Sequence, residues 1–81
     1  MTVVPPARGK RLHHLVVGTE AKEEVRVIAL PEHRLVATIS LGLKVEGLAA
    51  DPSGCALIVV DASQVYALEW PLKGLPHEAL D

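Results

Sequence analysis

The chain has 81 residues, of which 49% are apolar, and its formal net charge is −2. This apolar fraction excludes intrinsic disorder as the overall state, and the length allows one small domain or part-domain over residues 1–81. Ten acidic residues against eight basic ones argue against a general attraction to nucleic acid or to an acidic membrane.

The apolar side chains are almost all aliphatic, and the only aromatic residues are Tyr66 and Trp70. Small aliphatic side chains each bury little area, and a chain of about 80 residues seldom gains more than about 3–5 kcal/mol from its own core. Cys55 is the single cysteine, which excludes an internal disulfide and fits a reducing compartment, so we predict a cytoplasmic protein. The composition therefore raises the question of outside support for the fold.

A basic cluster lies near the N-terminus, where Arg8, Lys10 and Arg11 occur within four positions and residues 1–13 hold no acid. This spacing would suit a phosphate-contacting arm, but a solvated arm or loop is the commoner role of such a cluster. Nucleic acid is therefore not the expected partner. The apolar run Ala56–Val60 is far shorter than the roughly 20 residues that span a bilayer, so no membrane segment is expected.

Short apolar segments follow in chain order, separated by Gly and Pro and rich in β-branched residues. We assign one strand to Gly9–Gly18 and another to Val25–Leu30, which is apolar at five of its six positions. Residues 19–25 between them (TEAKEEV) contain good helix formers but little apolar surface. We predict a long hairpin loop there, with a short helical turn at residues 20–23 as the alternative.

The next segment, Arg34–Leu41, alternates and predicts a strand with Leu35, Ala37, Ile39 and Leu41 on one face. Three further strands are expected at Val45–Ala50, Ala56–Val60 and Val65–Trp70, and Thr2–Val4 supplies a first or closing strand. Residues 72–81 are predicted to be irregular. The fold class is therefore all-β and antiparallel.

An internal repeat relates the two halves of the chain. The stretch Glu24–Pro31 aligns without gaps on Gln64–Pro71, 40 positions later, with Val25 on Val65 and Ile28 on Leu68. The strand upstream of each stretch matches at a shift of about 43. We place the approximate repeats at residues 9–44 and 45–71. A strand-rich unit of about 40–45 residues has the size of one four-stranded propeller blade.

From Val25 onward the chain resembles the YVTN-type β-propeller repeat family, a relative of the WD-repeat and NHL propellers. The residues that carry this resemblance are Val36-Ala37-Thr38-Ile39, Gly42, Gly47, Asp51-Pro52-Ser53-Gly54, Leu57–Asp61 and Val65-Tyr66-Ala67-Leu68. Ile58 stands where the family has a tyrosine. The resemblance covers about 46 residues and implies blade-like antiparallel sheets, as a propeller fragment or partial propeller of nearly two blades.

Closed propellers need at least about four blades, so two blades would leave apolar faces and strand edges bare. A small closed β-barrel or a sandwich of six or seven strands is the alternative fold. We expect a non-enzymatic protein–protein interaction or assembly module that contributes blades to a larger propeller or complex. A protein partner or self-association would cover the bare faces. The alternative is a ligand-binding or catalytic subunit with a site at a shared interface, to which this chain adds a histidine and an acid.

The candidate site residues have structural interpretations as well. Adjacent His13 and His14 point to opposite faces of a strand, so they do not suit one metal ion. Together with His33 and His77 they make four histidines, and we expect all four at surface or loop positions. Cys55 is interpreted as an inert thiol. No catalytic residue, metal or cofactor is assigned.

Two acids and two aromatic residues complete the candidates. Asp51 and Asp61 flank one strand and are expected to bond their own turns. Trp70 and Tyr66 are the candidate interface residues, because large aromatic side chains are favoured where interfaces bind most tightly, and core filling is the competing role of Trp70.

Overall fold

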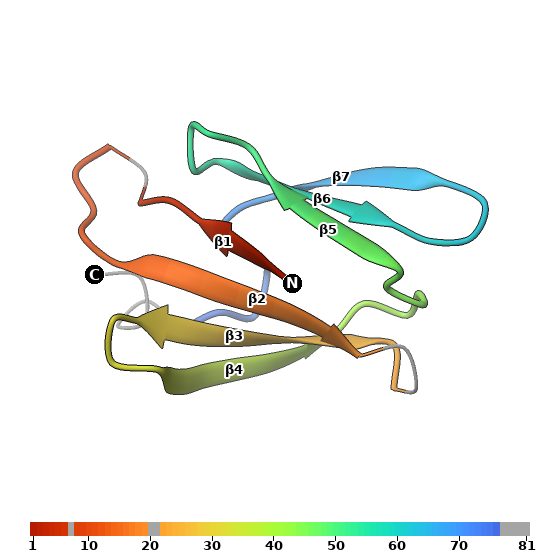
Figure 1. Cartoon of the computed structure of the whole chain (residues 1–81), viewed down its shortest axis with the longest axis horizontal. Coiled ribbons are helices and arrows are strands. Elements are labelled where there is room, and N and C mark those ends of the chain that lie inside the picture. The colour runs from red at the N-terminus through yellow and green to blue at the C-terminus, as the bar shows by residue number, and fades with distance from the viewer. Residues whose placement is uncertain (7, 20–21, 77–81) are drawn as a thin grey trace.

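The computed structural model describes residues 1–6, 8–19 and 22–76, which form seven strands and no helix (Figure 1). The strands are β1 (Thr2–Val4), β2 (His13–Thr19), β3 (Glu24–Leu30), β4 (Arg34–Ser40), β5 (Gly47–Ala50), β6 (Ala56–Val60) and β7 (Val65–Glu69). The expected all-β fold is confirmed. No helix in these ranges is long or apolar enough to cross a membrane.

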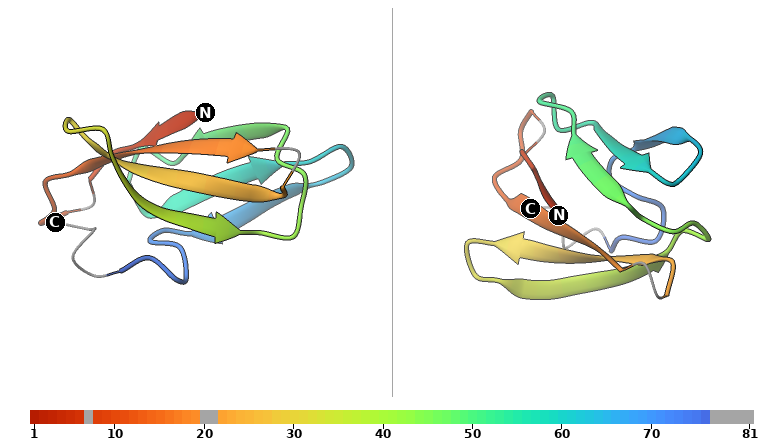
Figure 2. Two further views of the ribbon diagram at one scale, coloured as in Figure 1. Left: turned by 90° about the horizontal axis from the view of Figure 1, so that it is seen from below. Right: turned by 45° about the vertical axis from the view of Figure 1, so that its right-hand side comes forward.

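The strands form two antiparallel sheets in which sequence neighbours pair. The first sheet has the order β1-β2-β3-β4 and the second the order β5-β6-β7. Figure 2 shows the sheets as two layers, and the first strands of the sheets, β1 and β5, contact each other. Neither sheet closes on itself, so the closed-barrel alternative is wrong for the described chain.

The core lies between the two layers. On β2 and β3 the inward residues Val16 and Val27 pair with each other, and on β6 and β7 Leu57 pairs with Leu68. The fully buried side chains are Val4, Val16, Val25, Val27, Leu57 and Val59. Because β-branched valines fit a pleated surface, alternate residues of these strands form a closely packed aliphatic layer.

A β-bulge changes the orientation of residues along β4. Ala37 pairs with Val27 and Leu35 pairs with Ile28, so Val36 is an extra residue in the ladder. Leu35 therefore faces away from the core and is 57% exposed, whereas Ile39 packs against the core. The prediction that Leu35 shares a face with Ala37 and Ile39 is wrong for this reason.

The connection between β2 and β3 is shorter than the sequence predicted. Strand β2 continues to Thr19 and β3 begins at Glu24, because the Thr19 hydroxyl donates a hydrogen bond to the Glu24 carbonyl at 3.0 Å and their backbones pair. The predicted long loop is therefore reduced to the four positions between Thr19 and Glu24. The alternative helical turn falls partly on residues 20 and 21, which lie outside the described residues.

Gly18 allows a close approach between the two layers. A Cβ atom at this position would lie 2.5 Å from Cγ1 of Val45, in the link between β4 and β5. Val45 is 6% exposed and belongs to the core, although the sequence assigned it to the next strand, which begins at Gly47. The missing side chain of Gly18 thus leaves room for the link to pack against the first sheet.

Candidate interaction surfaces

One bare apolar surface lies on the side of the first sheet that faces away from the second. We call it the first outer face, and its members are Val3, Leu15, Val17, Ile28, Leu30 and Leu35. A single row crosses all four strands, because Val3 pairs with Leu15, Leu15 with Ile28, and Ile28 with Leu35. The ends of this row, Val3 and Leu35, are 44% and 57% exposed.

A second bare surface lies on the opposite side of the molecule. We call it the second outer face, and its members are Ala49, Ala56, Ile58, Val60, Val65 and Ala67. Ile58 is central, since it pairs with Ala49 on one side and Ala67 on the other. Val60 and Val65 pair at one end of this face, and Val65 is 68% exposed. Neither outer face belongs to the core or packs against it.

Few charged side chains interrupt these surfaces. The strand alternation places Glu24 and Arg26 on the first outer face, toward one end of β3. Glu69, at the end of β7, lies on the second outer face beside Ala56. The aliphatic row of the first outer face is therefore flanked on one side by Val17, Arg26 and Thr38 and on the other by His13 and Leu30, whereas the charge on the second outer face lies at its margin.

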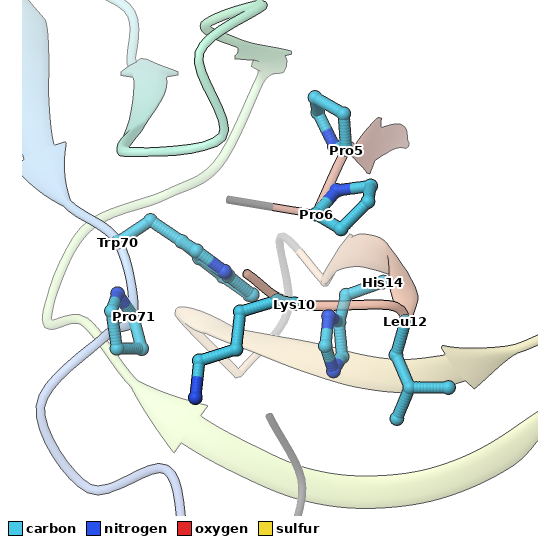
Figure 3. A pocket seen from close by; sticks show the side chains of 7 residues that line it. All are labelled: Pro5, Pro6, Lys10, Leu12, His14, Trp70 and Pro71. Carbon is cyan, nitrogen blue, oxygen red and sulfur yellow. The ribbon is translucent and has the colours of Figure 1, made fainter. Parts of the chain in front are cut away.

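A small cavity opens between the layers at one end of the molecule. Figure 3 shows Trp70 and Pro71 on one side of it and His14 and Leu12 on the other, with Lys10, Pro5 and Pro6 completing the wall. Its volume is about 70 Å³. A cavity that accommodates benzene has about 150 Å³, so this one has room for a side-chain tip or a few waters. No acid lines it among the described residues.

A larger groove, of about 470 Å³, lies where the outermost strands β4 and β7 diverge. Ile39, Leu41, Leu68 and Leu72 form its apolar floor, and Glu69 and Lys73 lie along it. Ser40 also lines the groove, and no histidine or cysteine does so in the described chain. The groove is thus a mainly apolar gap between the edges of the two sheets.

The three histidines that the structure describes are not gathered into a metal site. His13 is exposed and His14 is 3% exposed on the opposite side of β2, as their adjacency predicted, and His33 is exposed in the β3–β4 turn. The expected surface position is wrong for His14, because Trp70 covers it with ring centroids 5.7 Å apart. His77 lies outside the described residues. No group of three potential metal ligands occurs in the part of the chain that the structure describes.

Cys55 lies in the turn before β6 and is exposed. Its backbone N–H donates a hydrogen bond to the Ser53 hydroxyl at 3.2 Å. Its carbonyl accepts a hydrogen bond from the backbone N–H of Trp70 at 3.0 Å. The inert thiol stays a prediction.

Two aspartates hold the turns at the ends of β6, as the sequence predicted. Asp51 accepts a hydrogen bond from the backbone N–H of Ser53 at 2.8 Å. Asp61 accepts bonds from the backbone N–H groups of Ser63 and Gln64, both at 2.8 Å. These bonds favour the charged carboxylate, so they lower the pKa of both side chains. Their role is structural, since they lie at opposite ends of the strand.

Replacing Asp61 by Asn should flatten the acid side of the stability profile. The pKa of Asp61 is lower in the folded chain than in the unfolded chain, so its charge contributes stability above the unfolded pKa and loses it as the pH falls through the folded pKa. We expect the variant to melt at a lower temperature than the wild type near neutral pH and to approach it as the pH falls through the lowered pKa of Asp61. Melting followed by circular dichroism from pH 2 to 7 measures this. Parallel curves for the two proteins would contradict it.

The basic cluster occupies the loop between β1 and β2, where Arg8, Lys10 and Arg11 are all exposed. A loop was the commoner role expected for these cations, but the predicted strand Gly9–Gly18 is wrong at its first end, because β2 begins only at His13. Lys10 also lines the small cavity. The phosphate-contacting role stays a prediction.

The two candidate interface aromatics lie mainly inside the molecule. Trp70 is 9% exposed and belongs to the core, and Tyr66 is half-buried and packs against it. Core filling by Trp70, the competing role, agrees with this position. Sequence reasoning did not identify the aliphatic outer faces residue by residue. The available signal was the strand Ala56–Val60, which is apolar on both sides.

Comparison with known proteins gives no further assignment: no protein-family model, no curated protein and no solved structure matches the chain.

Proposed function

We propose that this chain is a non-enzymatic protein–protein interaction or assembly module that contributes two blade-like sheets to a larger propeller or complex. The observation that carries the proposal is the pair of aliphatic outer faces. An antiparallel sheet with one face in water normally carries polar residues on that face. Here the row Val3–Leu15–Ile28–Leu35 and the row Ala49–Ile58–Ala67 hold no polar side chain.

The strand edges support the same proposal. Strands β4 and β7 each pair on one side only, so their outer backbone groups have no sheet partner in the described chain. Open edges and contiguous apolar patches promote association, and soluble monomers usually avoid both. The partner that covers them is a protein surface that is equally apolar. The lone cysteine and the absence of an assigned disulfide fit a cytoplasmic setting for this assembly.

Non-enzymatic action is favoured by the lining of one hollow and the size of another. The groove of about 470 Å³ between β4 and β7 is large enough for a ligand, but no histidine or cysteine of the described chain lines it. The cavity beside Trp70 has roughly 70 Å³, below the about 300–1,000 Å³ of ordinary ligand pockets. The described lining residues also lack an acid to work with His14 as an acid–base pair.

The proposal is tested by sedimentation of the full chain at several concentrations, with the dye anilinonaphthalene sulfonate as a probe of exposed apolar surface. We expect the bare faces either to be covered by association, seen as a mass above that of one chain, or to bind the dye in the monomer. Lysine at Val65 should then reduce dye binding, and lysine at Ala62, in the exposed β6–β7 turn, should not. A folded monomer that binds no dye would overturn the proposal.

A further inference from the structure

The internal repeat and the strand pairing together define which residues of the two sheets correspond. The alignment matches Val25 to Val65. Val25 pairs with Gly18 on β2, and Val65 pairs with Val60 on β6, so the match extends from β3 and β7 to β2 and β6. The strand pairing thereby sets the shift of the upstream strand at 42, which corrects the value of about 43 expected from the sequence. The corrected correspondence matches Leu15 to Leu57, Val16 to Ile58, Val17 to Val59, Val27 to Ala67 and Ile28 to Leu68.

Matched residues face opposite ways relative to the layer between the sheets. Val25 is fully buried in that layer, whereas Val65 is 68% exposed on the second outer face. Conversely, Leu57 is fully buried there, whereas its match Leu15 lies on the first outer face. If a two-fold axis related the sheets, the same side of each would face the layer between them, and both members of each matched pair would be buried. Opposite sides face that layer instead, so the sheets are stacked head-to-tail, with unlike sides in contact.

It follows that each outer face corresponds to one side of the contact that the chain already makes. The first outer face, with Leu15, Val17 and Ile28, corresponds to the buried side of the second sheet, with Leu57, Val59 and Leu68. The second outer face, with Ile58, Val65 and Ala67, corresponds to the buried side of the first sheet, with Val16, Val25 and Val27. The larger leucine-rich surface and the smaller valine- and alanine-rich surface thus each occur twice, once covered and once bare.

We infer that copies of this chain associate head-to-tail, with the first outer face of one copy packed on the second outer face of the next. This inference rests on the proposed function and names the partner as a second copy. The new contact continues the stacking between the two sheets of one chain and joins a leucine-rich surface to a smaller aliphatic one, as that contact does.

Charged residues lie on both outer faces. Glu69, the charged residue on the second outer face, is exposed at the end of β7, beside Ala56. Arg26 is matched to Tyr66, which is only half-buried, so its guanidinium can reach water beyond the contact.

Such a contact uses a different surface on each copy, so it produces a ring or an open chain of copies. Rings of two to four copies would contain about four to eight sheets, the range of closed propellers.

The test uses two variants of the full chain, each blocked on one face. Leu15→Lys places a charge on the first outer face at the position matched to buried Leu57. Val65→Lys places one on the second outer face at the position matched to buried Val25. Ala62→Lys is the control outside both faces. Circular dichroism establishes that each variant is folded, and native mass spectrometry gives its mass over a range of concentrations.

We expect the wild type and Ala62→Lys to form assemblies, and each blocked variant to associate at least about 100-fold more weakly, because an unpaired charge is costly to bury. Mixing the two blocked variants should restore one contact, from the free first face of Val65→Lys to the free second face of Leu15→Lys. The product should be a 1:1 dimer with no larger species.

Other results separate the explanations. If Val65→Lys alone still dimerises and mixing adds nothing, like faces pair and the head-to-tail inference is wrong. A wild-type monomer that binds the hydrophobic dye overturns self-association but leaves the interaction module intact. A wild-type monomer without dye binding overturns both.

Discussion

Replacing Leu57 by Ala should destabilise the folded chain by about 3–5 kcal/mol. Leu57 is fully buried at the centre of the second sheet, where it pairs with Ala50 and Leu68. Its removal loses apolar burial and leaves a cavity at the largest of the fully buried side chains, since the others of this group are valines. Because a domain of this length has only about 4–12 kcal/mol of total stability, most of that stability should disappear. Urea unfolding followed by circular dichroism at low protein concentration measures the change.

Leu35→Ala is the matched control, since it makes the same chemical change at a position that is 57% exposed. We expect its free energy of unfolding to lie within about 0.5 kcal/mol of the wild type, as is usual for surface substitutions. Equal destabilisation by the two variants would show that Leu35 is buried in the folded chain. It would also remove one end of the first outer face.

Replacing Trp70 by Ala should cost about 3–5 kcal/mol, the range for a large aromatic core residue. The Trp70 ring covers His14 and closes one end of the space between the layers, and its backbone N–H bonds to Cys55. Its loss would enlarge the cavity and expose a polar side chain that is 3% exposed in the folded chain. Far-UV circular dichroism is the suitable probe, because the variant has lost its only tryptophan.

Trp70→Phe retains an aromatic ring and should recover a substantial part of the lost stability, because it fills more of the space than Ala does. This pair of variants also tests the two roles of Trp70. If Trp70 serves only a contact with a partner, the isolated chain should unfold at the same urea concentration with Trp or Ala at this position. A large shift identifies a core residue.

The sequence predicts the strands well because two local signals agree. Turn-forming residues such as Gly54 and Asp61 end the apolar segments, and alternation within Arg34–Leu41 distinguishes a strand from a helix. The same local reasoning predicted that Asp51 and Asp61 bond their turns, because an aspartate reaches the backbone two residues ahead without help from the rest of the fold.

The sequence predicts the buried faces less well because burial depends on contacts between distant residues. His14 is buried by Trp70, which lies 56 positions later, and the local sequence around His14 holds no sign of that contact. In Ala56–Val60 every residue is apolar, so alternation cannot distinguish the side that packs from the side that stays bare. The two outer faces became clear only from the pairing register.

The extra residue Val36 determines how far the apolar row of the first sheet extends. Without this insertion the alternation of β4 would continue unbroken, Leu35 would turn toward the interior, and the row would stop at Ile28 on the third strand. With it, the aliphatic strip runs from one margin of the sheet to the other. The width of surface available to an incoming molecule is thus set by one inserted amino acid in an edge strand.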